Sequence, residues 1–269
     1  MEAMSEALKN LKLTGESKTV WTYEQMLQNR CDVYNSKSGA LDGVDCPICK
    51  NKGSVMEIIN GYVTTRECRC MAARKSLWRI ERSGLRDVVD LYTLERYEAR
   101  EPWQRKVMET AKRFLADEEA RWWYFGGQVG AGKTHICTAI TTELMRRGMA
   151  AKYMLWRDEA VQLKACVTDD QQYNAIISPL KTVPVLYIDD LFKAEKGKFP
   201  SAADVNIAFE LLNYRYNNRE LYTIISSEKT MNDLLDIDEA VGSRVYERTK
   251  AGGYQLSLSP DKSKNYRLK

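Results

Sequence analysis

Residues 127–134 read Gly127-Gln128-Val129-Gly130-Ala131-Gly132-Lys133-Thr134 and fit the pattern GxxxxGK[ST] in full. A short apolar run precedes this stretch, and a run of helical character extends from it to about Arg147. Glycines let backbone N–H groups close around phosphate oxygens, and a helix N-terminus adds partial positive charge. We therefore expect a loop that binds nucleoside triphosphate, with Lys133 on the β- and γ-phosphates and the Thr134 hydroxyl on Mg²⁺. A glycine-rich turn that ends in Lys-Thr by chance is the weaker alternative.

A second run, Val185-Leu186-Tyr187-Ile188-Asp189-Asp190, is apolar up to its two carboxylates. An Asp at the carboxyl end of a buried strand lies at the crevice where open α/β sheets bind ligands. We expect Asp189 to hold the hydrated Mg²⁺ and Asp190 to orient or deprotonate the attacking water. The alternative is a polar strand end that caps the next helix.

From about residue 85, apolar runs of strand length alternate with helical patterns. This alternation predicts an α/β fold with a five-stranded parallel sheet flanked by helices. The strands are expected at 122–125, 151–155, 185–188, 222–226 and 254–258. The helices are expected at 133–147, 157–167, 203–217 and 239–248. The polar, basic tail 261–269 is expected to fray.

The first part of the chain has a different pattern. Helices are predicted within residues 1–40, from the spacing of Met4, Leu8 and Leu11 and of the apolar residues near Met26, and again over 70–85. Between them, Asn60-Gly61 joins two short strand-like runs and predicts a hairpin.

Cysteines flank this hairpin, in Cys46-Pro47-Ile48-Cys49 and in Cys68-Arg69-Cys70. Two thiolate pairs on either side of a hairpin can complete a tetrahedral Cys₄ site for Zn²⁺. Such a closed site leaves no open coordination position, so its expected role is structural. The second pair is spaced more tightly than is standard, and four unrelated buried thiols are the alternative. We expect two domains, a helical and zinc-binding domain over 1–84 and an ATPase domain over 85–269.

The composition narrows the classes of function. Lys and Arg total 41 and Asp and Glu total 37, so the net charge of +4 does not indicate a nucleic-acid partner by itself. The cysteine count of 7 is odd, which argues against a disulfide framework, and Cys31, Cys137 and Cys166 are expected to be core thiols. The single histidine, His135, nearly excludes catalysis by Ser-His or Cys-His pairs. Neither a membrane helix nor a secretory signal is visible, so a cytoplasmic protein is expected.

Together these motifs resemble those of the DnaC/DnaI-type replicative helicase loaders, a branch of the AAA+ ATPases. The resemblance covers about residues 85–260, and the cysteine module more loosely. Its further marks are Trp103-Gln104, His135 directly after the phosphate loop, Ile224-Ile225-Ser226-Ser227-Glu228 and Gly242-Ser243-Arg244-Val245-Tyr246-Glu247-Arg248. The resemblance implies an AAA+ ATPase that uses ATP, Mg²⁺ and Zn²⁺, with residues 127–135 around the nucleotide. Few residues follow the last strand, so no C-terminal helical lid is expected, as in helicase loaders.

The resemblance also implies catalytic roles outside the two motifs. Sensor 1, a polar residue near the γ-phosphate, would be Ser227 or Glu228, although Asn is usual at the latter position. Asp190 stands where most AAA+ proteins carry Glu, so slow hydrolysis is expected.

Arg248 would be the arginine finger that reaches the nucleotide of a neighbouring subunit and offsets charge on the transferring phosphoryl group. Arg244, one turn earlier, would share this task. The alternative for either arginine is a surface ion pair with Glu239 or Glu247.

The same resemblance implies a partner and a substrate. The zinc module and its flanking helices would grip a hexameric DnaB-type helicase, and the ATPase would help to place it on single-stranded DNA. The proposed DNA contacts are a loop with Lys193, Lys196 and Lys198, and the interleaved rings and charge of Tyr214-Arg215-Tyr216. A solvated loop and helix packing are the stronger alternatives for these residues.

Two other functions fit the same motifs. One is an IstB-like ATPase that assists DNA transposition, and the other is a zinc protein that uses nucleotide as a switch and barely hydrolyses it. The cysteine module favours the helicase loader, because IstB-like chains generally lack it.

Overall fold

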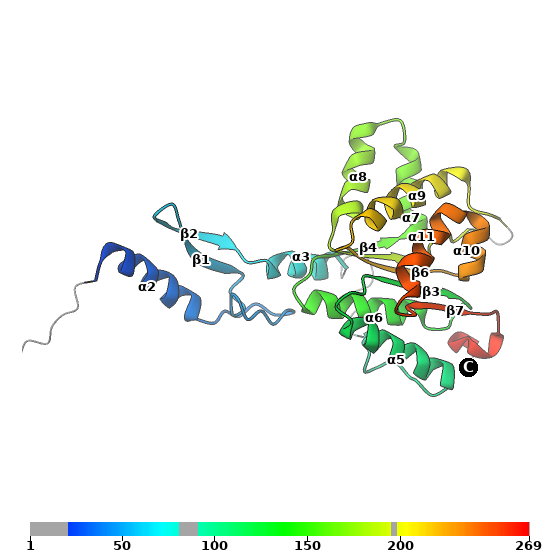
Figure 1. The fold of residues 1–269 in the computed structure, drawn as a ribbon, viewed down its shortest axis with the longest axis horizontal. Coiled ribbons are helices and arrows are strands. Elements are labelled where there is room, and N and C mark those ends of the chain that lie inside the picture. Colours follow the sequence, from blue (N-terminus) through cyan, green and yellow to red (C-terminus); the bar gives the residue numbers. More distant parts are fainter. Residues whose placement is uncertain (1–20, 81–90, 195–197, 269) are drawn as a thin grey trace, which may run out of the picture.

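The computed structural model describes residues 21–80, 91–194 and 198–268, with the side chains of 76–80 left aside. The predicted helix at Met4, Leu8 and Leu11 lies outside the described residues, as do Lys196 and the predicted helical stretch 81–85. A large body formed by the chain from helix α5 onward dominates Figure 1, and a smaller N-terminal part projects from it.

The large body is built on a sheet of five strands in the order β4-β5-β6-β3-β7. The strands are β3 (Trp122–Gly127), β4 (Ala151–Leu155), β5 (Val185–Asp189), β6 (Tyr222–Ser226) and β7 (Gln255–Leu258). All neighbouring pairs are parallel, so every strand ends at the same edge of the sheet. The predicted α/β fold with a five-stranded parallel sheet is confirmed.

Helices cover both faces of this sheet, as Figure 1 shows. One face carries α5 (Pro102–Ala116) and α6 (Lys133–Arg146). The other carries α7 (Trp156–Ala165), α8 (Asp170–Thr182), α9 (Ala202–Asn217), α10 (Met231–Ile237) and α11 (Glu239–Lys250). Because side chains alternate along a strand, Trp122 and Tyr124 of β3 pack on the second set of helices, and Trp123 and Phe125 pack on the first.

The N-terminal part contains α2 (Tyr23–Ser36), β1 (Ser54–Ile59), β2 (Tyr62–Glu67) and α3 (Cys70–Ile80). The hairpin turn is confirmed, since Asn60 and Gly61 have φ angles of 51° and 80°, as a tight turn between twisted strands requires. Its small core is formed by Val44, Val55, Ala73 and the cysteines of the two predicted pairs. This core is separate from the two cores of the sheet, and α3 connects them by contacting β4 and α6.

The C-terminal tail is ordered against the phosphate loop, so the prediction that it frays is wrong. It forms two short 3₁₀ turns, Lys262–Lys264 and Tyr266–Leu268. The Tyr266 N–H donates to the Gly130 carbonyl at 2.9 Å, and the Tyr266 hydroxyl donates to the Glu98 carbonyl at 2.8 Å. Tyr266 thus anchors the tail through tertiary contacts, which the polar composition of the tail does not reveal.

Among the described residues, no helix combines the length and the apolar character needed to cross a membrane.

Candidate nucleotide site and metal centre

The glycine-rich loop lies between the end of β3 and the start of α6. Gly127, Gly130 and Gly132 all have left-handed φ angles, of 95°, 73° and 80°. A Cβ atom on Gly127 would lie 1.9 Å from the Leu258 carbonyl oxygen, so only glycine fits where the loop passes β7. The loop and the first turn of α6 form one wall of a cavity of about 490 Å³.

Lys133 is the buried cation of this wall, with 6% of its surface exposed. Its Nζ donates to the carbonyl oxygens of Gly127 at 2.9 Å and Gln128 at 2.7 Å, so the side chain folds back along the loop. Burial lowers the pKa of Lys133, and the nearby carboxylates of Asp190 and Glu228 offset part of that effect.

Thr134 and Asp189, the residues predicted to hold Mg²⁺, lie side by side. Thr134 Oγ1 donates to Asp189 Oδ1 at 3.3 Å. The Tyr153 hydroxyl donates to Asp189 Oδ2 at 3.0 Å, and the Ser226 hydroxyl donates to Oδ1. A hydroxyl next to a buried carboxylate is a set of hard oxygen donors that suits Mg²⁺.

The two supporting hydroxyls, those of Tyr153 and Ser226, were not predicted from the sequence. Their strands, β4 and β6, flank β5 on its two sides, and each places a hydroxyl beside the carboxylate at its end. Ser226 ends β6 and could have been found as a polar strand end next to β5 once the strand order is known, but Tyr153 lies in the middle of β4 and gives no such signal.

Asp190 follows the strand in a left-handed conformation, with a φ angle of 57°. Its N–H donates to Ser226 Oγ at 3.1 Å, and its Oδ2 accepts from Lys193 Nζ at 2.7 Å. Lys193 also forms an ion pair with Glu228 at 3.0 Å, and all three side chains line the cavity. The turn after β5 folds Lys193 back onto the strand ends, where it pairs with these two carboxylates, and its contact with DNA stays a prediction.

Ser227, the sensor 1 prediction, is fully buried. Its hydroxyl donates to the Leu191 carbonyl at 2.6 Å and accepts from the Lys229 N–H at 3.0 Å. The next residue, Glu228, is the one that lines the cavity. The role of Ser227 as a sensor stays a prediction, and its observed contacts hold two loops together.

His135 belongs to an aromatic group that also lines the cavity. Its ring stacks on Tyr92 at 4.6 Å between centroids and meets the edge of Tyr97 at 5.3 Å. His135 Nε2 lies 2.8 Å from the Thr93 carbonyl oxygen. Burial lowers the pKa of His135, so the imidazole is neutral at neutral pH. With Tyr266 of the tail, these rings give this part of the cavity an apolar surface on which a nucleobase can stack.

Arg244 and Arg248, the predicted arginine fingers, lie on α11 and contact α9. Arg244 Nε donates to Asn213 Oδ1 at 2.9 Å, and its guanidinium lies 4.9 Å from the centre of the Phe209 ring. Arg248 donates to the Tyr216 carbonyl and lies 4.8 Å from the centre of its ring. Neither arginine is among the residues that line the cavity. Their role toward a neighbouring subunit stays a prediction.

Arg215 is fully buried, so its predicted contact with DNA is wrong. Its guanidinium donates to the Thr223 hydroxyl at 2.9 Å and to backbone carbonyls at the end of α8 and the start of β6. Arg215 has a structural role instead, because these carbonyls would otherwise be buried without a donor.

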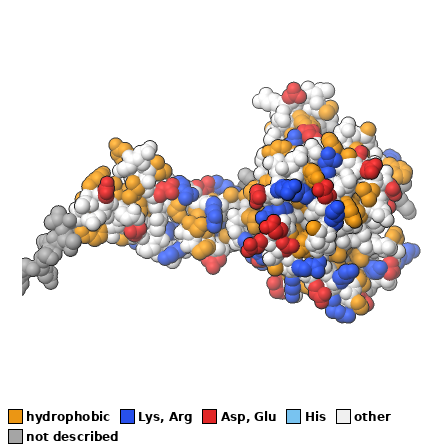
Figure 2. Space-filling view, in the orientation of Figure 1, with side chains coloured by type: hydrophobic (Ala, Val, Ile, Leu, Met, Phe, Trp, Pro, Cys, Tyr) orange, Lys and Arg blue, Asp and Glu red, His pale blue; other side chains and the backbone are white. Residues whose placement is uncertain are grey.

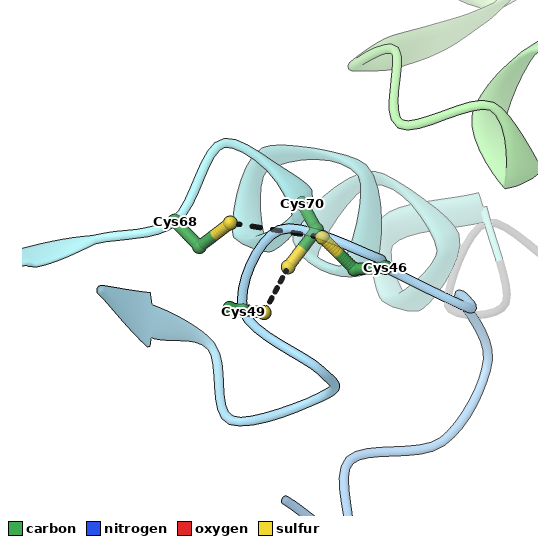
Figure 3. Close-up of side chains that lie close together, drawn as sticks. All are labelled: Cys46, Cys49, Cys68 and Cys70. Atoms are coloured by element: carbon green, nitrogen blue, oxygen red, sulfur yellow. Dashed lines mark hydrogen bonds between the residues drawn. The ribbon is translucent and has the colours of Figure 1, made fainter. Parts of the chain in front are cut away.

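The four predicted zinc ligands converge on one point, as Figure 3 shows. Their Sγ atoms all lie within 4.8 Å of one another, with Cys46 to Cys68 at 3.7 Å and Cys49 to Cys70 at 3.5 Å. Sulfur atoms at these separations suit a tetrahedral zinc ion with Zn–S bonds of about 2.3 Å.

The surroundings of the cluster shift its thiols in different directions: burial raises the pKa of Cys68 and raises that of Cys70 to about 12, although the Arg74 guanidinium offsets part of the effect on Cys70. Burial raises the pKa of Cys49, but the hydrogen bond from the Gly53 N–H and the contacts with the other thiols bring it down to about 6. The Arg74 guanidinium lies beside Cys70 and donates to the Val44 carbonyl at 2.7 Å, which ties the first knuckle to α3. These donors around the sulfurs are the kind of support that metal-bound cysteines have.

A parallel sheet in this strand order, a glycine-rich loop at a helix N-terminus and an acidic strand end opposite it define a P-loop ATPase of the AAA+ type. The chain belongs to the family of IstB-like ATP binding proteins, which it matches over residues 48–248.

Relatives connect this family to phage elements and to replication. The chain is 33% identical over 214 residues to the phage-like element PBSX protein XkdC of Bacillus subtilis, covering 76% of this chain and 79% of that protein. It is 22% identical over 200 residues to the replicative helicase loader DnaC of Escherichia coli K12, covering 72% and 76% of the two chains.

Solved structures share the fold. The crystal structure of the DnaC helicase loader aligns with a TM-score of 0.51 and 21% identity, over 63% of this chain and 96% of that one. The AMPPCP-bound DnaA of Aquifex aeolicus aligns with a TM-score of 0.51 and 21% identity, over 66% of this chain and about half of DnaA, 53%.

Proposed function

We propose that this ATPase loads a DnaB-type hexameric replicative helicase onto single-stranded DNA in the cytoplasm. The observation that carries the proposal is the combination of a complete nucleotide cavity with a cysteine module that has its own core. The relatives named as replicative helicase loaders support it. We divide the chain into a helicase-interaction domain, 1–84, and an ATPase domain, 85–269.

The ATPase site would work with three groups of this chain. Lys133 would leave the loop carbonyls and pair with the β- and γ-phosphates, because a phosphate oxygen is the stronger acceptor for its ammonium group. Thr134 and Asp189 would hold Mg²⁺, which neutralises phosphate charge. Asp190 would accept the proton of the attacking water.

The cysteine module would be built around a structural Zn²⁺. Its hairpin is short, and a two-stranded hairpin alone is marginally stable in water. A metal bound by Cys46, Cys49, Cys68 and Cys70 would join the two knuckles and α3 and so supply the stability that the small core lacks.

The helicase would bind the outer end of this module. Large apolar side chains are exposed there on α2 and on the hairpin, and Figure 2 shows them on the part that projects from the ATPase body. Tyr62 is 74% exposed, Tyr23 65% and Met26 50%. Exposed apolar side chains gathered on one end of a protein mark an interaction surface.

The remaining contacts of the proposal concern DNA and self-association. With Arg215 and Lys193 occupied elsewhere, we retain the half-exposed ring of Tyr214 as a surface on which a base can stack. Arg248 and Arg244 would complete the nucleotide site of a neighbouring copy.

The test measures phosphate release with single-stranded DNA, with and without the replicative helicase of the host. A loader should respond to both and should retain the helicase in a pull-down. A Tyr62→Ala variant should lose the helicase and keep its DNA-independent ATPase rate, because Tyr62 lies far from the cavity. Retention of a transposase in place of the helicase would favour the IstB-like alternative.

A further inference from the structure

We infer that Lys193 is a positioning residue of the ATPase reaction, which holds the carboxylates of Asp190 and Glu228 together beside the site of the γ-phosphate. The inference rests on the nucleotide site proposed above. It goes further by giving a function to a lysine that the sequence motifs do not include.

The geometry of Lys193 is that of a bridge between two strand ends. Its Nζ lies 2.7 Å from Asp190 Oδ2, after β5, and 3.0 Å from Glu228 Oε1, after β6. The Lys193 side chain is 38% exposed, and those of Asp190 and Glu228 are 21% and 31% exposed. The three groups are thus partly shielded from water, where a charge interaction is stronger than on an open surface.

The backbone around Lys193 is fixed. The Leu191 N–H donates to the Ser226 carbonyl at 2.9 Å, and the Lys193 N–H donates to the Asp190 carbonyl at 2.9 Å. Asp190 and Phe192 both have left-handed φ angles, 57° and 58°, although neither is glycine. Such backbone persists only where the surrounding contacts impose it, so the turn holds Lys193 at this place.

The charges explain why a cation is needed there. Without Lys193, two carboxylates would face each other at the place where the triphosphate, itself strongly negative, must enter. Lys133 contacts loop carbonyls and not these carboxylates. Burial lowers the pKa of Lys193, but the bonds to Asp190 and Glu228 outweigh it and raise the pKa, so the bridging amine is charged.

The contact with Lys193 also orients Asp190, the proposed general base. Lys193 occupies Oδ2 of Asp190, and no described residue donates a hydrogen bond to Oδ1. In hydrolysis a water proton would pass to that free oxygen while the water oxygen forms its bond to the γ-phosphorus. The bond from phosphorus to the bridging oxygen then breaks, and ADP leaves with the electron pair.

The test compares full-length Lys193→Met, Lys193→Arg and the double variant Lys193→Met with Glu228→Gln. Steady-state phosphate release gives kcat and KM for each. Lys193→Met should lower kcat about tenfold and raise KM, since a misplaced base loses part of its catalytic effect. Lys193→Arg should restore most of kcat, because a guanidinium can bridge the same oxygens. In the double variant, Glu228→Gln should bring KM part of the way back toward the wild-type value, because it removes one of the two facing negative charges.

Lys164→Met is the matched control. Lys164 forms an ion pair with Asp204 at 2.7 Å with similar exposure, 34% and 17%, but away from the cavity. It should leave kcat and KM unchanged.

Two results would overturn the inference. One is a folded Lys193→Met protein with unchanged kcat and KM. The other is an equal loss in Lys193→Met and Lys193→Arg with no recovery from Glu228→Gln, which is what a purely structural lysine would give. A Lys133→Ala variant tests the nucleotide site independently of Lys193. If Lys133→Ala loses ATP binding while the Lys193 variants behave as in either result above, the proposed nucleotide site stands and only the role of Lys193 is refuted.

Discussion

Thr134 and Asp189 are 55 residues apart in the chain, yet Thr134 Oγ1 donates to Asp189 Oδ1 at 3.3 Å. The parallel sheet brings them together, because the loop after β3 and the end of β5 lie at the same edge. The two residues predicted to hold Mg²⁺ are thus already within hydrogen-bond distance of each other.

Lys133→Ala should abolish ATP binding. The substitution removes the one side-chain cation of the glycine-rich loop, and a small residue leaves no group to replace it on the β- and γ-phosphates. Titration with a fluorescent ATP analogue measures the affinity, and the wild-type protein under the same conditions is the control. An affinity equal to wild type would refute the assignment of the loop.

Asp190→Asn should keep ATP binding and lower the rate of hydrolysis by about 100-fold, since an amide cannot accept the proton of water. Phosphate release and nucleotide affinity should be measured on the same preparation. If such a variant still delivers the helicase, the nucleotide acts as a switch and hydrolysis is not needed for loading. A rate equal to wild type would show that Asp190 is not the base.

The purified protein should contain about one Zn²⁺ per chain, and a chelator should unfold the N-terminal module before the ATPase domain. Metal analysis by mass spectrometry and circular dichroism during chelation check this. Cys68→Ser should lose the metal, and Cys166→Ser, a thiol outside the cluster, should keep it. If neither the wild type nor Cys166→Ser contains metal, the cluster does not bind zinc and its four cysteines are only packed against one another.

Asp204→Asn should cost about 1 kcal/mol at neutral pH, or about 3 °C in unfolding midpoint. Burial raises the pKa of Asp204, but Lys164 and the Ser201 cap outweigh it and hold the pKa below its ordinary value of 3.8. A carboxylate with a depressed pKa stabilises the fold above that ordinary value, and its contribution fades as the pH falls through the folded pKa.

Midpoints measured between about pH 3 and about pH 7 should therefore show the two proteins converging at the acid end. A gap between wild type and Asp204→Asn that is constant over this range would contradict the assignment of the effect to this ion pair.

Much of the fold and of the site was predictable from local pattern. The loop 127–134, the strand ending in Asp189 and the hairpin turn at Asn60 are each encoded by neighbours in the chain, so their chemistry is visible in the sequence. The same holds for the four cysteines of the cluster, because the hairpin between the two pairs brings them close together.

Other parts depend on contacts between distant segments. Arg215 has the sequence context of a surface arginine, but its guanidinium donates hydrogen bonds to backbone carbonyls of α8 and β6. Lys193 and Tyr266 enter the cavity only because a strained turn and an ordered tail direct them there. Helices α5, α8 and α10 were not predicted. Helix α10 has only 7 residues, but α5 buries a regular apolar face with Val107, Ala111 and Phe114, so its periodicity was visible in the sequence and was overlooked.

The bond from the Tyr266 N–H to the Gly130 carbonyl has a practical consequence. The final turn of the chain is part of the cavity wall, and Gln104 of α5 also donates to the hydroxyl of Tyr266. A fluorescent label attached within this turn, next to Tyr266, would disturb the cavity wall and change the nucleotide affinity under study. Labels for binding assays belong on a segment that does not line the cavity.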